Sequence, residues 1–341
     1  MKTFRFNRGE AILAALALAI FYLQPSTVSA QGPNDSGTYY SEADGYCGSY
    51  LKTALGDVIN SHTELTYSQL WECYYESDVR DDGYVWDMYS GTSNFVLGDD
   101  QASGQSITYE GQVYNREHTM PKSWFGSATP MYTDLTHIVP TDGYVNAKRS
   151  NYPFGETDNP TYSSENDFSL LGPSSLSGYS GTVFEPNDEY KGDFARIYFY
   201  MVTCYESVVS GWSCDMLDGT AYPAFTDWAL ELLLQWSEND PVSEKEINRN
   251  EVVYQKQGNR NPFVDYPGIE QYIWGDMQDV VFSYSDYSTT GIERIAASAK
   301  TTAGTGTVYS ITGQTVGTKP ANGLSLPKGI YIINGRKFVV K

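Results

Sequence analysis

The sequence has few positive charges. Its 341 residues contain 22 Lys and Arg against 42 Asp and Glu, which gives a formal net charge of −20 at pH 7. A protein that coats nucleic acid by bulk electrostatics needs a basic face to displace counterions. This composition therefore excludes a histone-like binding mode, but it is compatible with an enzyme that has a small basic site. The aromatic content of 15% indicates a folded chain.

Long hydrophobic runs are also scarce, and the clearest one lies at residues 11–23. This run is too short to cross a bilayer. Three basic residues precede it, and small residues at Val28 and Ala30 follow it in the positions that a signal peptidase requires. Residues 1–30 are therefore predicted to be a secretory signal peptide. We expect the mature protein to be secreted or held at the cell surface, without a membrane span.

Cysteine is limited to four residues, Cys47, Cys73, Cys204 and Cys214. In an exported chain an even number of cysteines favours disulfides. Three pairings are possible, and we expect the pairing that closes two short loops, from 47 to 73 and from 204 to 214. Zinc is disfavoured by the spacing, because the chain has no Cys-x-x-Cys pair and no His at ligand spacing from a Cys.

The composition changes near residue 284. Residues 284–307 are rich in Ser, Thr, Ala and Gly and are predicted to be a flexible linker. Residues 308–341 contain short β-like runs, with a hairpin signal at Asn334-Gly335. This tail resembles the C-terminal sorting domain of the type IX bacterial secretion system, which implies that it engages export machinery. The alternative is a small β-module that packs on the body of the protein or binds sugar.

Residues 31–283 are predicted to form the main domain, with mixed α and β structure. A helix is expected over 142–148, with Thr141 as its N-cap and Asp142 favourable at its positive end. Because strands are expected before it, the middle of the chain should form a strand–strand–helix block with longer helices packed around it. The other predicted helices are 50–59, 68–76, 193–205, 226–236 and a capping-box helix from Ser243 to Gly258. The predicted strands are 84–89, 114–119 and 136–139.

The chain has three histidines, His62, His118 and His137. His62 is expected at the surface, and His137 is expected to be a structural hydrogen-bonding residue. The strand–strand–helix block contains His118 and His137 and also concentrates the scarce positive charge. A local positive site on an acidic body suits a phosphate group. The basic residues in this block are Arg116, Lys122, Lys148 and Arg149.

Glu117, His118 and Asn146 form a candidate catalytic set within this block. A carboxylate and an amide oxygen, completed by waters, form a hard-cation site suited to Mg²⁺ or Ca²⁺. Adjacent residues on a regular strand point to opposite faces. Glu117 and His118 can therefore share one site only if the strand ends or bulges there, and Pro121 favours an ending. With an unperturbed pKa of about 6.5, His118 could then take a proton from water.

An ordered set of motifs resembles the secreted endonuclease I family of nucleases, which is built on the ββα-metal, or His-Me, finger. Residues 115–118 read Asn-Arg-Glu-His, and residues 257–263 read Gln-Gly-Asn-Arg-Asn-Pro-Phe. Together with the tail, the resemblance implies an α+β fold. Its expected parts are a ββα-metal finger core packed with several helices, and a small C-terminal β-sandwich-like module. The remaining matches lie at 86–90, 134–155, 184–196, 240–242 and 273–275.

The resemblance also implies roles for individual residues. His118 would be the general base, and Glu117 and Asn146 would hold one Mg²⁺, for which Ca²⁺ or Mn²⁺ could substitute. Arg149 or Arg116 would steady phosphate charge. The residues expected to contact the substrate are Lys122, Lys148, Asn151 and Arg260.

The chain departs from the periplasmic members of this family in two places. Only 15 residues separate His118 from Asp134, so the product-binding Arg of those members has no counterpart. The position of the Glu that orients their base is occupied by Tyr132, and either Asp134 or a backbone carbonyl is expected to replace it. Arg260 is left with two alternatives, a phosphate contact or a helix cap.

The predicted function is that of a secreted, monomeric, Mg²⁺-dependent, non-specific endonuclease that does not discriminate between the sugars of nucleic acids. It would cut DNA, and RNA as family members often do, to leave 5′-phosphates. An alternative within the family is a secreted ribonuclease. An alternative of another class is an exported surface-binding or adhesion protein, which the acidity, the 29 tyrosines and the β-like tail suggest.

Overall fold

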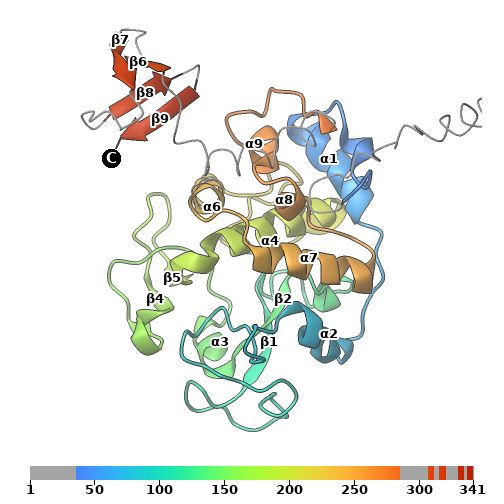
Figure 1. Ribbon diagram of the computed structural model, residues 1–341. Helices are drawn as coiled ribbons and strands as arrows, with labels where there is room; N and C mark the ends of the chain where they lie inside the picture. The colour runs from blue at the N-terminus through green and yellow to red at the C-terminus, as the bar shows by residue number, and fades with distance from the viewer. Residues whose placement is uncertain (1–35, 285–305, 311–314, 320–328, 334–335, 341) are drawn as a thin grey trace, which may run out of the picture.

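The computed structural model describes residues 36–284, 306–310, 315–319, 329–333 and 336–340 (Figure 1). The predicted signal peptide and most of the predicted linker lie outside these residues. The helices of the described chain are α1 (Gly48–Ile59), α2 (Gln69–Ser77), α3 (Gly143–Arg149), α4 (Lys191–Cys204), α5 (Glu206–Val209), α6 (Asp227–Asn239), α7 (Glu244–Gln257), α8 (Pro262–Asp265) and α9 (Ile269–Ile273). The strands of the main body are β1 (Tyr114–His118), β2 (Ile138–Asp142), β3 (Tyr162–Ser163), β4 (Leu170–Pro173) and β5 (Thr182–Glu185).

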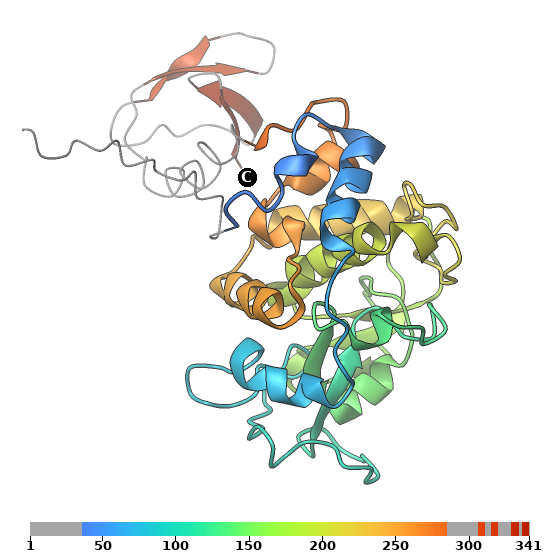
Figure 2. The same ribbon diagram turned by 90° about the vertical axis from the view of Figure 1, so that its right-hand side faces the viewer.

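Helix α4 is the centre of the main body (Figure 1). All of its residues are buried, because α1, α6 and α8 pack around it. Its aromatic side chains, among them Phe194, Tyr198 and Phe199, belong to the main hydrophobic core. The β1–β2 pair and α3 lie at the end of the body opposite α1 and α9 (Figures 1 and 2). A second antiparallel sheet has the order β3-β4-β5. The architecture is therefore an α+β core of helices with two small antiparallel sheets.

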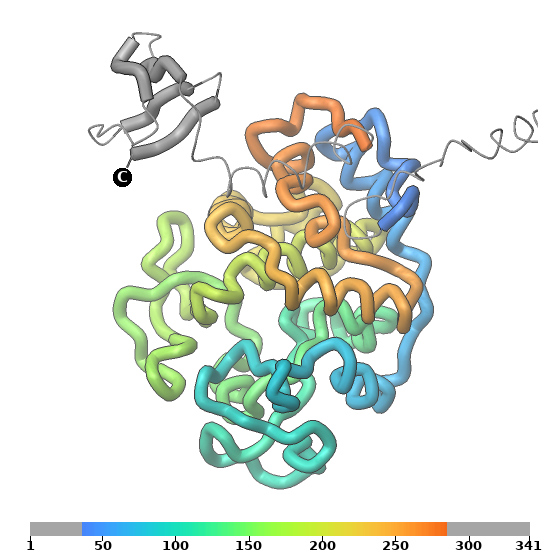
Figure 3. Tube along the Cα trace, viewed as in Figure 1, coloured from blue at the N-terminus to red at the C-terminus, as the bar shows by residue number. Residues whose placement is uncertain are grey.

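The two ends of the main body meet beside α1 (Figure 3). The amide of Gly45 donates to the carbonyl of Phe282 at 3.0 Å, and the amide of Phe282 donates to the carbonyl of Tyr46 at 2.8 Å. These bonds join segments from opposite ends of the predicted 31–283 domain. The first and last described segments of the main body are therefore hydrogen-bonded to each other.

Local signals predicted α1, α2, α3, α4, α6 and α7, whereas the short helices α5, α8 and α9 were not anticipated. Helix α7 begins with a capping box in which Ser243 and Glu246 exchange hydrogen bonds, and it ends at Gly258 with φ of 83°. The predicted strand at 84–89 is wrong, since this segment makes only isolated bridges at Tyr84 and Val85. The Asp87 carboxylate accepts hydrogen bonds from nearby backbone amides and turns the chain there. The short strands β3, β4 and β5 were not anticipated.

The expected disulfides are not found. The four cysteines, all within the described residues, are free thiols. Cys204 lies at the end of α4 in the main core, whereas Cys73 lies on α2 in a separate hydrophobic cluster. The prediction rested on the even number of cysteines and on export. Neither says whether two cysteines are close together, and a disulfide requires close and correctly directed Cβ atoms.

In the described parts of the tail, strands β6 (Gly306–Ser310), β7 (Thr315–Lys319), β8 (Gly329–Ile333) and β9 (Arg336–Val340) form an antiparallel sheet of order β7-β6-β8-β9. In the β8–β9 pair, Ile333 lies opposite Arg336. The sorting-domain assignment and the domain boundaries stay predictions. Within the described residues, no helix combines the length and the apolar character that a membrane crossing requires.

Candidate active site

Strands β1 and β2 and helix α3 position the predicted catalytic set. The strands pair antiparallel with Glu117 opposite Val139 and His118 opposite Ile138. β2 runs directly into α3, and the Asp142 side chain caps that helix by accepting from the amides of Tyr144 and Val145. The cap is thus Asp142 and not the predicted Thr141, because it is the Asp142 carboxylate that accepts the two amides of the first helical turn.

Close approach of α3 to β1 depends on a glycine at the first position of the helix. A Cβ on Gly143 would lie 2.7 Å from Ile107 and 3.2 Å from the carbonyl of Val113. The glycine lets α3 settle against β1, where the Asn146 Nδ2 donates to Asn115 Oδ1 at 2.7 Å. Asn146 is thereby fixed beside the strand that carries Glu117 and His118.

A cleft of about 450 Å³ opens over this unit. The predicted residues that line it are Arg116, Glu117, His118, Lys122, Asn146 and Asn151. β1 ends at His118, so the requirement that the strand stop at this point is met. The structure therefore brings the expected base, both expected metal ligands, Arg116 and two of the four expected substrate contacts to one water-accessible surface.

Glu117 is held from behind by two donors. Its Oε1 accepts from the Tyr89 hydroxyl at 2.9 Å and from Arg149 Nη1 at 2.6 Å. Burial raises the pKa of Glu117, while the charge of Arg149 and the bond from Tyr89 oppose that rise. These contacts restrict the carboxylate to one orientation at the cleft wall, which is what a ligand for a hard cation requires.

His118 is oriented by a backbone carbonyl. Its Nε2 lies 3.1 Å from the carbonyl oxygen of Tyr132, in the 3-10 turn Met131–Thr133. The ring also packs against the Tyr132 ring, with centroids 5.1 Å apart. Because a carbonyl only accepts, Nε2 must carry the proton, and Nδ1 keeps the lone pair.

The environment of His118 favours the neutral ring. Burial lowers its pKa to about 3, and the neighbouring His137 and Lys122 act in the same direction, while the bond to Tyr132 opposes them. Of the two alternatives for orienting the base, the backbone carbonyl is the one observed. Asp134 instead accepts from the Tyr200 and Tyr205 hydroxyls.

Arg149 does not face the cleft as a phosphate contact would. Its side chain is fully buried. Besides Glu117, it donates to the carbonyls of His118 at 3.1 Å and Thr119 at 2.6 Å. Asn146 and Arg149 are three residues apart on α3, so both side chains lie on the helix face that packs against β1. The Arg149 side chain is the longer of the two, and it extends past the strand to the side away from the cleft. The expected direct phosphate contact is corrected to a supporting position behind Glu117.

Two other expected substrate contacts also lie away from the cleft. Lys148 Nζ lies over the Tyr144 and Tyr162 rings, 4.9 and 5.4 Å from their centroids. Arg260 is buried and pairs with Asp265 and with Glu251. The ring contacts place Lys148 on the outer side of α3, and the buried ion pairs place Arg260 within the helical scaffold.

Sequence reasoning missed two aromatic residues in the cleft wall. The Arg116 guanidinium lies 3.5 Å from the Tyr67 ring centroid and 4.2 Å from that of Trp71. Both rings line the cleft. Arg116 Nη1 also donates to the backbone carbonyl of Tyr67 at 2.5 Å. The two rings and this bond together hold the guanidinium at the cleft wall. No local pattern links residues so far apart in sequence, so this contact required the fold.

The donor set at the cleft fits a hard divalent cation. Asn146 donates through Nδ2 to Asn115, which fixes its amide and leaves Oδ1 as an acceptor. Glu117 supplies a carboxylate within the same cleft. An anionic and a neutral oxygen, with waters completing the shell, match the preference of Mg²⁺ and related ions and do not match that of soft metals.

Comparisons with known proteins agree with this geometry. The Endonuclease I family model matches residues 47–268. An extracellular ribonuclease of Bacillus amyloliquefaciens is 37% identical over 246 residues, which cover 70% of this chain and 79% of the relative. An extracellular ribonuclease of Bacillus subtilis (strain 168) is 33% identical over the same shares. An Endonuclease-1 of Buchnera aphidicola subsp. Baizongia pistaciae (strain Bp) is 26% identical over 167 residues, 43% of this chain and 60% of the relative.

The fold, the cleft and these matches together define a nuclease, a hydrolase of phosphodiester bonds. The chain belongs to the Endonuclease I family. Membership implies a nucleic acid substrate and a metal-dependent reaction. The enzyme prediction is confirmed, and the adhesion alternative receives no support. Two matched relatives are named as extracellular ribonucleases, which favours the ribonuclease alternative over the predicted non-specific activity on DNA.

Proposed function

We propose that this protein is an exported endonuclease that hydrolyses RNA in an Mg²⁺-dependent reaction. The observation that carries the proposal is His118, held by the Tyr132 carbonyl, beside Glu117 and Asn146 in one cleft. The choice of RNA rests on the names of the two Bacillus relatives. DNA is the second candidate, and it rests on the motif resemblance described above.

The base in this proposal is His118 Nδ1. The Tyr132 carbonyl binds the opposite ring nitrogen and so keeps the lone pair on Nδ1. A neutral imidazole accepts a proton from the attacking water, and the bond to Tyr132 stabilises the imidazolium that results. The neighbouring positive charges favour prompt loss of that proton, since they disfavour the charged ring.

Glu117 and Asn146 would hold the cation, with Arg149 and Tyr89 keeping the carboxylate in place. When bound, Mg²⁺ neutralises phosphate charge and stabilises the leaving oxygen. Ca²⁺ and Mn²⁺ share the oxygen-ligand preference and are candidate substitutes.

The substrate would lie along the cleft wall formed by Arg116, Lys122 and Asn151. Arg116 is restrained by its two aromatic neighbours, so little side-chain entropy is lost when it binds a phosphate oxygen. Products would carry 5′-phosphates, with the cut made on the 3′-oxygen side.

The test is a cleavage assay on matched single-stranded RNA and DNA with Mg²⁺, Ca²⁺, Mn²⁺ or EDTA. We expect faster cleavage of RNA, no cleavage in EDTA, and 5′-phosphate ends that serve as ligase substrates. Undiminished cleavage in EDTA would contradict the metal-dependent mechanism. Faster cleavage of DNA would show that DNA, the second candidate, is the preferred substrate.

We further propose that residues 1–30 direct export and that the tail from 284 onward serves sorting rather than catalysis. A linker rich in Ser, Thr and Gly couples two modules weakly. Deleting residues 284–341 should leave hydrolysis unchanged and disturb secretion or surface attachment. A truncated protein that is folded but inactive would contradict this boundary.

A further inference from the structure

A second group of potential ligands lies outside the cleft. One ring nitrogen of His62, one carboxylate oxygen of Asp134 and the Cys204 Sγ all lie within 4.8 Å of one another. They come from the segment after α1, the turn before β2 and the last residue of α4. Among the described residues, this is the one group of three or more His, Cys, Asp or Glu side chains that converge so closely.

We propose that His62, Asp134 and Cys204 bind one zinc-class transition metal ion. Imidazole, thiolate and carboxylate are the ligand types of protein zinc sites. A thiolate discriminates against Mg²⁺ and Ca²⁺, which prefer oxygen. The site would therefore be chemically distinct from the cation site at Glu117 and Asn146. Sequence spacing argued against zinc, but spacing rules apply to ligands from one local segment, and these ligands come from three.

Burial and charge suit such a site. Asp134 and Cys204 are buried, whereas His62 is half-buried and gives solvent access. Burial by itself would raise the pKa of Asp134. The nearby histidines and the bonds from Tyr205 and Gln257 outweigh burial and lower this pKa to about 2. These contacts favour the charged form of the Asp134 carboxylate, which suits a cation. Burial raises the pKa of the Cys204 thiol, so the thiol is protonated until a metal binds.

Binding is balanced by release of that proton. The sulfur–hydrogen bond of Cys204 breaks, a sulfur–metal bond forms, and the proton passes to solvent. No oxidation or reduction takes place. Cys204 has no disulfide partner in the structure. Its thiol donates to the Ile59 carbonyl at 3.6 Å, and this bond is lost with the proton when the metal binds.

Two tyrosines hold the ligands in place. Tyr200 and Tyr205 donate to Asp134 Oδ2 at 2.8 and 2.6 Å, and the Tyr205 hydroxyl also lies 3.0 Å from His62 Nε2. Metal–ligand bonds of about 2.0–2.3 Å require ligand atoms roughly 3.3–3.8 Å apart. The ligand atoms lie within 4.8 Å of one another, so they must move closer by about 1 Å to bind an ion. The half-buried His62 side chain is free to make this movement. An ion would then replace the Tyr205 hydroxyl as the bridge between His62 and Asp134.

Co²⁺ is the probe for the test, because a thiolate bound to Co²⁺ gives a charge-transfer absorption that oxygen ligands do not give. The full chain is stripped of metal, freed of chelator and titrated with Co²⁺. We expect this absorption to saturate near one equivalent and to disappear when Zn²⁺ is added. The oxygen-only site at Glu117 and Asn146 cannot produce it.

Matched variants assign the ligands. Cys204→Ser should lose the absorption, whereas Cys214→Ser, which removes another thiol of the same helical body, should keep it. His62→Ala should weaken Co²⁺ binding more than tenfold, and because His62 is half-buried this variant is expected to fold even if Cys204→Ser does not. Circular dichroism checks the fold of each variant.

The inference is overturned if the wild-type chain shows no thiolate absorption. It is also overturned if Cys214→Ser abolishes the absorption or if His62→Ala binds Co²⁺ as tightly as wild type. In those cases the three residues form a hydrogen-bonded network only.

Discussion

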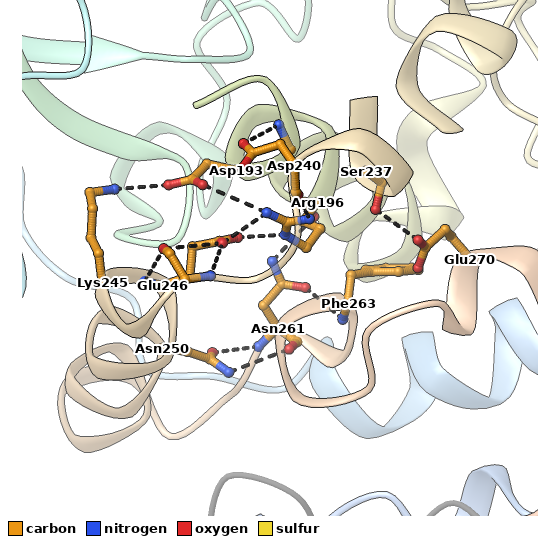
Figure 4. A network of polar contacts seen from close by, with 12 residues as sticks. Asp193, Arg196, Ser237, Asp240, Lys245, Glu246, Asn250, Asn261, Phe263 and Glu270 are labelled. Atoms are coloured by element: carbon orange, nitrogen blue, oxygen red, sulfur yellow. Dashed lines mark hydrogen bonds and ion pairs between the residues drawn. The ribbon is translucent and has the colours of Figure 1, made fainter. Parts of the chain in front are cut away.

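The cleft and the interior between α4 and α7 both contain charged residues, but the two regions use them differently. In the cleft, Arg116 and Lys122 reach a water-accessible surface. In the interior, Arg196 binds both carboxylate oxygens of Glu246, and Lys245 binds Asp193 at 3.0 Å (Figure 4). Each interior cation therefore has a carboxylate of the same chain, whereas a cleft cation can take its counter-ion from a substrate.

The interior network joins elements that are distant in sequence. Asn261, in the loop before α8, accepts through its side chain from Phe263 and donates to the Arg196 carbonyl on α4 (Figure 4). Buried ion pairs often add little net stability, because desolvation offsets their attraction. Their geometry nevertheless fixes how α4, α7 and α8 meet. The motifs at 184–196 and 257–263 thus identify the family through its scaffold and not through its chemistry.

Arg149 shows that the two uses of charge can meet at one wall. It lies behind the cleft, yet like the interior cations it is fully buried and paired with a carboxylate, Glu117. A positive charge in the sequence therefore marks a substrate contact only if the fold leaves it without a carboxylate partner.

The largest expected effect in the cleft is the loss of the base. His118→Ala should lower the cleavage rate by about 10²- to 10⁴-fold, because the attacking water must then lose its proton unaided. The variant should still fold, and its Mg²⁺ affinity should change little. Glu117→Gln is the matched comparison and should lose metal affinity, since it removes the charged ligand. Cleavage rates are measured beside metal titrations, and the two roles are reversed if His118→Ala loses metal binding while Glu117→Gln keeps it.

The largest expected effect in the interior is on stability. Arg196→Met leaves the buried Glu246 without its cation, and breaking a buried pair in this way costs about 3–5 kcal/mol of unfolding free energy. The cleavage rate of the folded variant should be unchanged. Arg80→Met, which breaks the exposed pair with Asp82, is the control and should unfold at nearly the wild-type denaturant concentration. An Arg196→Met protein that is stable but inactive would show that the network belongs to the catalytic machinery.

Features that depend on neighbouring residues could be predicted from the sequence. The capping box of α7, the β1–β2–α3 order and the adjacency of Glu117 and His118 are all local. The missed features depend on tertiary contacts. The Tyr67–Arg116–Trp71 stack and the Tyr132 carbonyl on His118 join segments that no periodicity connects. The disulfide prediction failed for the same reason, since it rested on counting cysteines.

A smaller effect concerns pH. Burial lowers the pKa of His118 to about 3 and also lowers that of His137. Below about pH 6.5 the unfolded chain binds protons that the folded protein does not, so stability is complete above pH 6.5 and is lost as the pH falls toward the folded pKa. One pH unit below 6.5, the buried His118 should cost about 1.4 kcal/mol. His137 should add to this loss in the same direction.

The measurement is denaturant unfolding in EDTA between pH 5 and 8, for wild type and for His137→Gln. Glutamine can still donate to the Met131 carbonyl that His137 contacts, but it cannot titrate. The variant should show a shallower loss of stability on the acid side. Equal slopes for the two proteins would mean that His137 does not resist protonation in the folded state.

The smallest expected effect distinguishes the cleft from the outer face of α3. Lys122→Ala removes one phosphate contact of the cleft wall and should raise KM several-fold with little change in kcat. It should also reduce the slope of log(kcat/KM) against log[salt] by about 0.7–1, because one fewer counterion is released. Lys148→Ala removes an equal charge over the Tyr144 and Tyr162 rings and should change the slope less. If Lys148→Ala has the larger effect, the substrate follows the outer face of α3. It would then not bind along the cleft wall that contains Lys122 and Asn151.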